Sequence, residues 1–386
     1  MRQGFLPRTV IILGMVSFLN DAASEMITPL LPIFLTATLG AGPVVVGLVE
    51  GVAEATASLL KFASGHLADR GWNPKGLVVG GYSLSNSARP LIGLAFGWTW
   101  VLVMRFLDRA GKGLRTAPRD ALIAASTDSR LRGRAFGFHR ALDNAGAVVG
   151  PLLAFALLGW GVDLHHVFLL SVVPGILVIL LLGFGLQAAP AVTGPVQAPA
   201  APGWRELDPR LRALVIATGS LALATAPEVF LVLWARTRGL EIVWVPLLWA
   251  AASAVKMTVA MPGGYLSDRC GRLSILVAGW SMRILVLVGL GLTATSELMI
   301  WALFLAYAGS LAFTEAAERA LIGDYAPAGK KATAFGLYHM TAGLLALPGA
   351  LLFGALWQWF GAATAFLSAA GLTLLSVTVL LVITSK

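Results

Sequence analysis

Two carboxylates lie inside an apolar stretch, at a spacing that lets them act together. Asp21 and Glu25 are four residues apart in the run that starts near Val10, so a helix places both on one face. A charge at mid-membrane costs about 2.5–3.5 kcal/mol on insertion scales, so each should face a cavity or a partner. We predict that the pair exchanges protons; the alternative is a fixed ion pair with a basic neighbour.

Two further apolar stretches carry charges. Arg105, Asp108, Arg109 and Lys112 recur at spacings of three and four, which gives one stripe on a helix. A stripe of charge cannot face lipid, so we expect it to face a cavity or the first helix. Earlier in the chain, Glu54 and Lys61 lie about two helical turns apart, so each is expected to pair with another helix.

These residues form two sets of candidates. His139 and Asp143 extend the first set, because a histidine can exchange protons near neutral pH, although a packed side chain is the alternative. The candidates for proton coupling are Asp21, Glu25, Glu54, Arg105, Asp108, His139 and Asp143. The candidates for the substrate cavity are Asn20, Lys61, Arg109, Lys112, Glu228, Glu315 and Arg319.

The pattern of residues favours neither a metal site nor an enzyme. Met257 and Met261 are four residues apart, as in a soft-metal pair, but no histidine or cysteine accompanies them on the predicted helix. We find no metal-ligand cluster, no nucleophile–base pair and no phosphate-binding loop. We therefore predict no metal, no cofactor and no catalysis.

Composition indicates a membrane protein. The chain has 386 residues, of which 58% are hydrophobic and 12% charged, whereas a soluble protein carries about 25% charge. A membrane span takes about 20 apolar residues, so about twelve helices fit. We predict them near residues 10–36, 44–64, 75–97, 99–122, 135–158, 165–187, 211–234, 243–265, 273–294, 297–324, 333–357 and 361–384.

The net charge of +9 follows the predicted topology. Basic residues gather in alternate loops and at both ends of the chain, among them Arg8, Arg70, Arg132, Arg205 and Lys386. By the positive-inside rule, both termini are expected in the cytoplasm and the protein in the inner membrane. This placement argues against nucleic acid as a partner.

The chain repeats itself at a displacement of 199 residues. The stretch Gly65-His-Leu-Ala-Asp69-Arg70 recurs as Gly264-Tyr-Leu-Ser-Asp268-Arg269, and Ala135-Phe-Gly137 recurs as Ala334-Phe-Gly336. Such a long period indicates two homologous halves, an arrangement that is usual in transporters with a site between the halves. We predict an N-terminal six-helix bundle at 1–186, a cytoplasmic linker at 187–209 and a C-terminal six-helix bundle at 210–386.

The repeated motif resembles the loop signature of the major facilitator superfamily. The segment around Arg105 resembles that family's fourth-helix motif, and Gly146-Ala-Val-Val-Gly150-Pro151 resembles its fifth-helix motif, which is common among proton-coupled exporters. The resemblance covers the whole chain. It implies an all-α membrane fold of two pseudo-symmetric six-helix bundles, with a cavity lined by helices one, four, seven and ten.

The resemblance also implies gating residues, because the loop aspartate of this family bonds a neighbouring helix in one state and releases it in another. The gating candidates are Gly65, Asp69, Arg70, Gly264, Asp268, Arg269 and Arg272. The first copy departs from the signature, since Trp72, Asn73 and Pro74 replace part of its usual Gly-Arg-Lys end.

We predict a monomeric secondary transporter that moves a small organic solute by alternating access. Protons are expected to drive it, and the fifth-helix pattern favours export. The basic stripe leaves uptake of an anionic solute as an alternative. A non-transporting membrane receptor or a lipid-modifying enzyme is an alternative of another class, although the chain shows neither a soluble signalling domain nor a catalytic cluster.

Overall fold

The computed structural model describes residues 6–70, 72–128, 131–185, 209–292, 296–325 and 331–384. The predicted linker at 187–209 therefore lies almost wholly outside the described residues. Those that are described form helices joined by short turns, with no strand among them.

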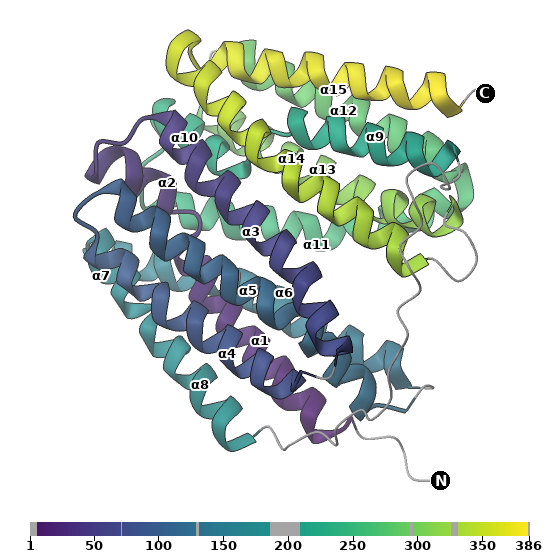
Figure 1. Cartoon of the computed structure of the whole chain (residues 1–386). Coiled ribbons are helices and arrows are strands. Elements are labelled where there is room, and N and C mark those ends of the chain that lie inside the picture. The colour runs from purple at the N-terminus through teal and green to yellow at the C-terminus, as the bar shows by residue number, and fades with distance from the viewer. Residues whose placement is uncertain are drawn as a thin grey trace. The chain divides into compact units, whose positions relative to one another are not determined.

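The described residues of the first half form ten helical elements, most of which are labelled in Figure 1. They are α1 (Arg8–Ile27), α2 (Leu31–Ile33), η1 (Phe34–Thr38), α3 (Pro43–Asp69), α4 (Pro74–Ala88), η2 (Pro90–Leu94), α5 (Trp98–Ser126), α6 (Arg132–Gly159), α7 (Leu164–Leu170) and α8 (Val172–Gly185).

The second half contributes longer, less interrupted helices. They are α9 (Pro209–Ala224), α10 (Glu228–Thr237), α11 (Trp244–Cys270), α12 (Arg272–Leu292), α13 (Glu297–Tyr325), α14 (Lys331–Phe360) and α15 (Ala362–Thr384). Within the described ranges, ten helical segments are long and apolar enough to cross a membrane. Outside that set lie α4, which is short, and α5, which carries the charged stripe.

Four predicted helices are interrupted in the structure. The predicted helix at 10–36 consists of α1, α2 and η1, and the predicted helix at 75–97 consists of α4 and η2. The predicted helix at 165–187 consists of α7 and α8, with Ser171 between them. The predicted helix at 211–234 is broken between Ala224 and Glu228, where Pro227 has no N–H to continue the helical hydrogen bonds.

The repeated motif lies within helices rather than after them, so the predicted ends at residues 64 and 265 were wrong. The first copy belongs to α3 as far as Asp69, and the second belongs to α11 as far as Cys270. The residues that end one helix and begin the next follow the motif in sequence. Gly271 has a φ of +89°, which glycine adopts without strain, and Asn73 caps α4 by accepting a hydrogen bond from the Lys75 N–H at 3.0 Å.

The chain divides into two compact units. The first contains residues 1–39, 56–198 and 243–250, and the second contains residues 40–55, 199–242 and 251–386. Residues 43–55 of α3 therefore belong to the second unit and the rest of α3 to the first. Residues 244–250 of α11 belong to the first unit and the rest of α11 to the second. The predicted boundaries at 186 and 210 stay a prediction.

Each unit repeats the packing of the other, which confirms the predicted pseudo-symmetry. In the first unit α1 packs against α6 and α8, and α4 packs against α5 and α8. In the second unit α9 packs against α14 and α15, and α12 packs against α13 and α15.

A matched aromatic residue lies in the core of each unit. Tyr82, in Gly81-Tyr82-Ser83, and Trp280, in Gly279-Trp280-Ser281, are both fully buried. Their displacement is 280 − 82 = 198 rather than 199, because the stretch from Asp268 to the start of α12 is one residue shorter than the stretch from Asp69 to the start of α4. The repeat therefore allows each side chain of one unit to be compared with the side chain at the corresponding position of the other unit.

Candidate functional site

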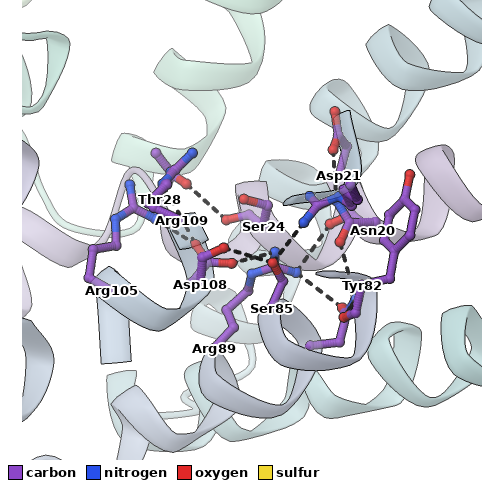
Figure 2. A network of polar contacts seen from close by, with 12 residues as sticks. Asn20, Asp21, Ser24, Thr28, Tyr82, Ser85, Arg89, Arg105, Asp108 and Arg109 are labelled. Atoms are coloured by element: carbon purple, nitrogen blue, oxygen red, sulfur yellow. Dashed lines mark hydrogen bonds and ion pairs between the residues drawn. The ribbon is translucent and has the colours of Figure 1, made fainter. Parts of the chain in front are cut away.

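A buried carboxylate surrounded by arginines lies between α4 and α5 (Figure 2). Asp108 Oδ1 is 2.8 Å from Nη2 of Arg89, and its Oδ2 is 3.5 Å from Nη1 of Arg105 and 3.7 Å from Nε of Arg109. Asp108 is 2% exposed. With guanidinium groups on several sides, this carboxylate is suited to hold helices together rather than to exchange protons.

Amide side chains connect this cluster to α1. Asn86 Nδ2 donates to Oδ1 of Asn20 at 3.2 Å, and Arg89 donates to the Asn20 backbone carbonyl at 3.3 Å. Asn20 in turn donates to Asp21 Oδ1 at 3.1 Å. Asn20, predicted to line a cavity, is 2% exposed and acts as a link between two charged groups.

Two carboxyl groups meet between α1 and α6. Asp21 and Asp143 lie within hydrogen-bonding range of each other. Asp143 also accepts hydrogen bonds from Ser17 Oγ at 2.6 Å and from Arg140 at 3.2 Å. Because an ionised carboxylate can only accept, a hydrogen bond between two carboxyl groups requires a proton on one of them.

Close packing of α1 and α6 brings these acids together. A Cβ atom on Gly146 would collide with the Phe18 carbonyl oxygen, and one on Gly150 would collide with the Ala22 carbonyl oxygen. These glycines belong to the fifth-helix motif, so the motif has a packing role here.

The other candidate on α1 has a different partner. Glu25 Oε2 accepts a hydrogen bond from Nε1 of Trp249 at 2.9 Å, and both residues belong to the first unit. Asp21 and Glu25 therefore have different hydrogen-bond partners, but Glu25 lies within electrostatic range of Asp21, and their paired action stays a prediction. Lys112, one of the cavity candidates, is exposed on α5 and lies within electrostatic range of Asp21.

His139 is buried on α6, one helical turn before Asp143. Only 4% of the residue is exposed. Arg119 and Asp120 of α5, together with Arg140 and Asp143 of α6, lie within electrostatic range of its ring. The histidine is thus placed among charged groups rather than in an apolar core.

An ion pair in the second unit lies beside the break between α9 and α10. Lys256 Nζ is 2.6 Å from the Glu228 carboxylate, and the two side chains are 32% and 23% exposed. On the other side of the break, the buried Tyr307 hydroxyl donates to the Ala226 carbonyl at 2.7 Å. The half-exposed pair is suited to contact a solute.

Glu315 and Arg319 form an ion pair along the exposed face of α13. Between them in sequence, Glu318 is 8% exposed and accepts hydrogen bonds from Trp280 Nε1 at 3.2 Å and from the Tyr338 hydroxyl at 3.0 Å. On α3, Glu54 and Lys61 are exposed.

The gating candidates separate into two groups. Arg272 reaches from α12 to Asp324 of α13 and donates to the Ala320 carbonyl at 3.1 Å, and its guanidinium is 3.7 Å from Asp268. Arg269 instead lies over the ring of Tyr265, 4.4 Å from its centre.

The first copy of the motif is described less fully. Gly65 of α3 packs beside Ala117 of α5, as Gly264 of α11 packs beside Ala316 of α13. Arg70 is exposed after the end of α3, whereas the side chain of Asp69 lies outside the described residues.

Sequence reasoning missed three charged side chains of the candidate site, namely Arg89, Lys256 and Arg283. Each is a charge inside a predicted apolar helix, which is the signal that identified Asp21 and Arg105. Arg283 is 2% exposed and donates to Thr314 Oγ1 at 3.3 Å and to the Ser310 carbonyl at 3.5 Å.

Comparison with known proteins identifies the family. The sequence model of the Major Facilitator Superfamily matches residues 13–314 and, in a second match, residues 245–386. An uncharacterised MFS-type transporter of Methanocaldococcus jannaschii is 31% identical over 360 residues, covering 92% of this chain and 89% of that protein. The chain belongs to the major facilitator superfamily. It is therefore a multi-pass membrane transporter of a small molecule.

Two further similarities are more distant. The multidrug resistance protein MdtH of Enterobacter sp. strain 638 is 27% identical over 299 residues, covering 76% of this chain and 73% of that protein. The structure of a bacterial homologue of the human lysosomal transporter Spinster has a TM-score of 0.79 at 15% identity, covering 97% of this chain and 96% of that one. The structural likeness shows the shared major facilitator fold.

Proposed function

We propose that this major facilitator transporter exports a small organic solute across the inner membrane in exchange for protons, with both termini in the cytoplasm. The observation that carries the proposal is the contact between the Asp21 and Asp143 carboxyl groups. A carboxyl pair that shares a proton can take up a second proton or release the first as its surroundings change.

The pair is confined to one half of the repeat. The positions 199 residues after Asp21 and Asp143 hold Ser220 and Ala342, neither of which ionises. The first unit is therefore the half in which we place proton coupling. The basic neighbourhood of Asp108 argues against a proton role for that carboxylate, which we propose to be structural.

Export is supported by the relatives and by the motif on α6. MdtH relatives are named as multidrug resistance proteins, and the segment from Gly146 to Pro151 resembles the motif common among proton-coupled exporters. We propose that the half-exposed Glu228–Lys256 pair contacts the solute from the second unit.

The test uses inverted membrane vesicles energised by respiration and a panel of lipophilic cations and organic acids. A compound that is exchanged for protons should partly dissipate the proton gradient across the vesicle membrane, and the fluorescence of an acridine dye measures that loss. Asp21→Asn and Asp143→Asn should abolish uphill transport of any such compound while counterflow exchange continues. Glu297→Gln is the control, because Glu297 is exposed at the start of α13 in the other unit. Uphill transport that survives in the double variant of Asp21 and Asp143 would refute the proposal.

A further inference from the structure

Apart from guanidinium nitrogens, two buried polar groups of the first unit have no hydrogen-bond partner within the described part of the chain. They are the hydroxyl of Tyr82 on α4 and Nε2 of His139 on α6, in residues that are 0% and 4% exposed. A buried polar group without a partner costs about 1–3 kcal/mol, so its retention calls for an explanation.

The second unit shows where these side chains converge. The residues that correspond to Tyr82, Arg119 and His139 are Trp280, Glu318 and Tyr338, by displacements of 198, 199 and 199. Trp280 and Tyr338 each donate a hydrogen bond to Glu318, at 3.2 Å and 3.0 Å. In the second unit, the three positions thus form a closed cluster of two donors and one acceptor.

The first unit carries the opposite charge at the central position. Arg119 can only donate hydrogen bonds, and it uses Nε and Nη2 on Asp120, at 3.0 Å and 2.9 Å. Tyr82 and His139 both lie within electrostatic range of Arg119. The same three positions therefore form an open cluster, in which the imidazole nitrogen remains available.

The open cluster lies next to the carboxyl pair. Asp143 follows His139 by four residues on the same face of α6, and Ser17 and Asp21 have the same spacing on α1. Ser17 and Asp21 both contact Asp143. His139 is seven residues into α6, about 10 Å from the end that the positive-inside rule assigns to the cytoplasm.

We infer that His139 is the relay that carries protons between the cytoplasmic side and the Asp143–Asp21 pair, an assignment that rests on the proposed proton coupling. Nε2 accepts a proton from water that reaches it when the transporter opens to the cytoplasm, and the imidazolium passes one proton to the Asp143 carboxylate and returns to its neutral form. Asp143 then shares that proton with Asp21. The Tyr82 hydroxyl orients the ring or the solvent beside it. The groups that set the charge around His139 are Arg119 and Asp120 of α5 and Arg140 and Asp143 of α6.

The experiment measures the current that follows a pH step across liposomes containing the full-length protein, without any solute. His139→Gln should slow the decay of this current by about tenfold or more, because a positioned acid–base group is lost. The displaced charge should stay the same, since the carboxyl pair is intact. Added imidazole should restore the rate in His139→Ala. Tyr338→Phe, at the matching position of the second unit, is the control and should leave the rate unchanged.

The outcomes separate the relay from the proposed function. An unchanged decay in His139→Gln, with the charge still lost in Asp21→Asn, would overturn the relay alone. No current in the wild-type protein would overturn proton coupling itself. If His139→Gln does not fold, nitrogen-15 NMR of a variant that keeps only His139 among the five histidines decides the matter. A ring with one protonation state between about pH 5 and about pH 8 would then refute the relay.

Discussion

Arg89, the residue that follows α4, and Asp108 of α5 form a 2.8 Å ion pair in which both side chains are almost fully buried. The two residues are unequal partners. Asp108 also lies near Arg105 and Arg109, whereas Asp108 is the one carboxylate described beside Arg89. Loss of the carboxylate therefore leaves more uncompensated charge than loss of one arginine.

This inequality predicts unequal costs of substitution. Asp108→Leu should lower the free energy of unfolding by about 3–5 kcal/mol, as expected when one partner of a buried pair is removed. Arg89→Met should cost less. Thermal unfolding in detergent measures both, with the half-exposed Asp120→Asn as the control on the same helix. An Asp108→Leu protein as stable as the wild type would show that the cluster does not hold α4 and α5 together.

A second prediction concerns a buried hydrogen bond from an arginine to a hydroxyl group. Both units form it at corresponding positions, but the helix that carries the donor in one unit corresponds to the helix that carries the acceptor in the other. Arg115 of α5 donates to Ser85 of α4 at 2.7 Å, and Arg283 of α12 donates to Thr314 of α13 at 3.3 Å. Ser85→Ala and Thr314→Val should each cost about 1.5–3 kcal/mol, because each removes the acceptor of a buried guanidinium. Ser87→Ala on the exposed face of α4 is the control. Equal unfolding temperatures for Ser85→Ala and Ser87→Ala would contradict this account.

The contact between α1 and α6 gives a third prediction. Gly146→Ala and Gly150→Ala should each destabilise the protein by about 1–3 kcal/mol, because the added methyl group meets backbone oxygens that cannot move aside cheaply. Gly137→Ala on the same helix meets no atom within 4 Å and should be neutral or slightly stabilising. The two core variants should also weaken proton-driven transport, since they separate Asp21 from Asp143. Normal stability in both would mean that the helices are less closely packed.

Gating provides the fourth prediction. Asp268→Asn removes an ion pair with Arg272 in which the aspartate side chain is 70% exposed. An exposed pair contributes at most about 1 kcal/mol, so the population open to the cytoplasm should rise by no more than about fivefold. Distances between spin labels on the cytoplasmic ends of the helices measure this shift, with Glu315→Gln as an exposed control on α13. A complete change of state would show that Asp268 has a stronger partner in another conformation.

The sequence was sufficient for the fold but not for the contacts within it. Apolar runs and the repeat at Gly65 and Gly264 predict the helices and the halves, because both depend on residue type and local spacing. The partner of Asp108 depends on the register between α4 and α5, which no spacing within one helix reveals. For the same reason, Asp143 was proposed without its contact to Asp21, and Glu228 without Lys256.

In the first unit the arginine is on α5 and its hydroxyl acceptor on α4 (Arg115 and Ser85), whereas in the second unit the arginine is on α12 and the hydroxyl on α13 (Arg283 and Thr314). This reversal limits which helices can be swapped between the two halves. A chimera with α12 in place of α4 would set Arg283 against Arg115, so that two buried guanidinium groups meet without an acceptor. The reverse graft would leave Ser85 beside Thr314 with no arginine. The smallest piece that can be transplanted between the halves here is therefore a pair of packed helices, α4 with α5 or α12 with α13.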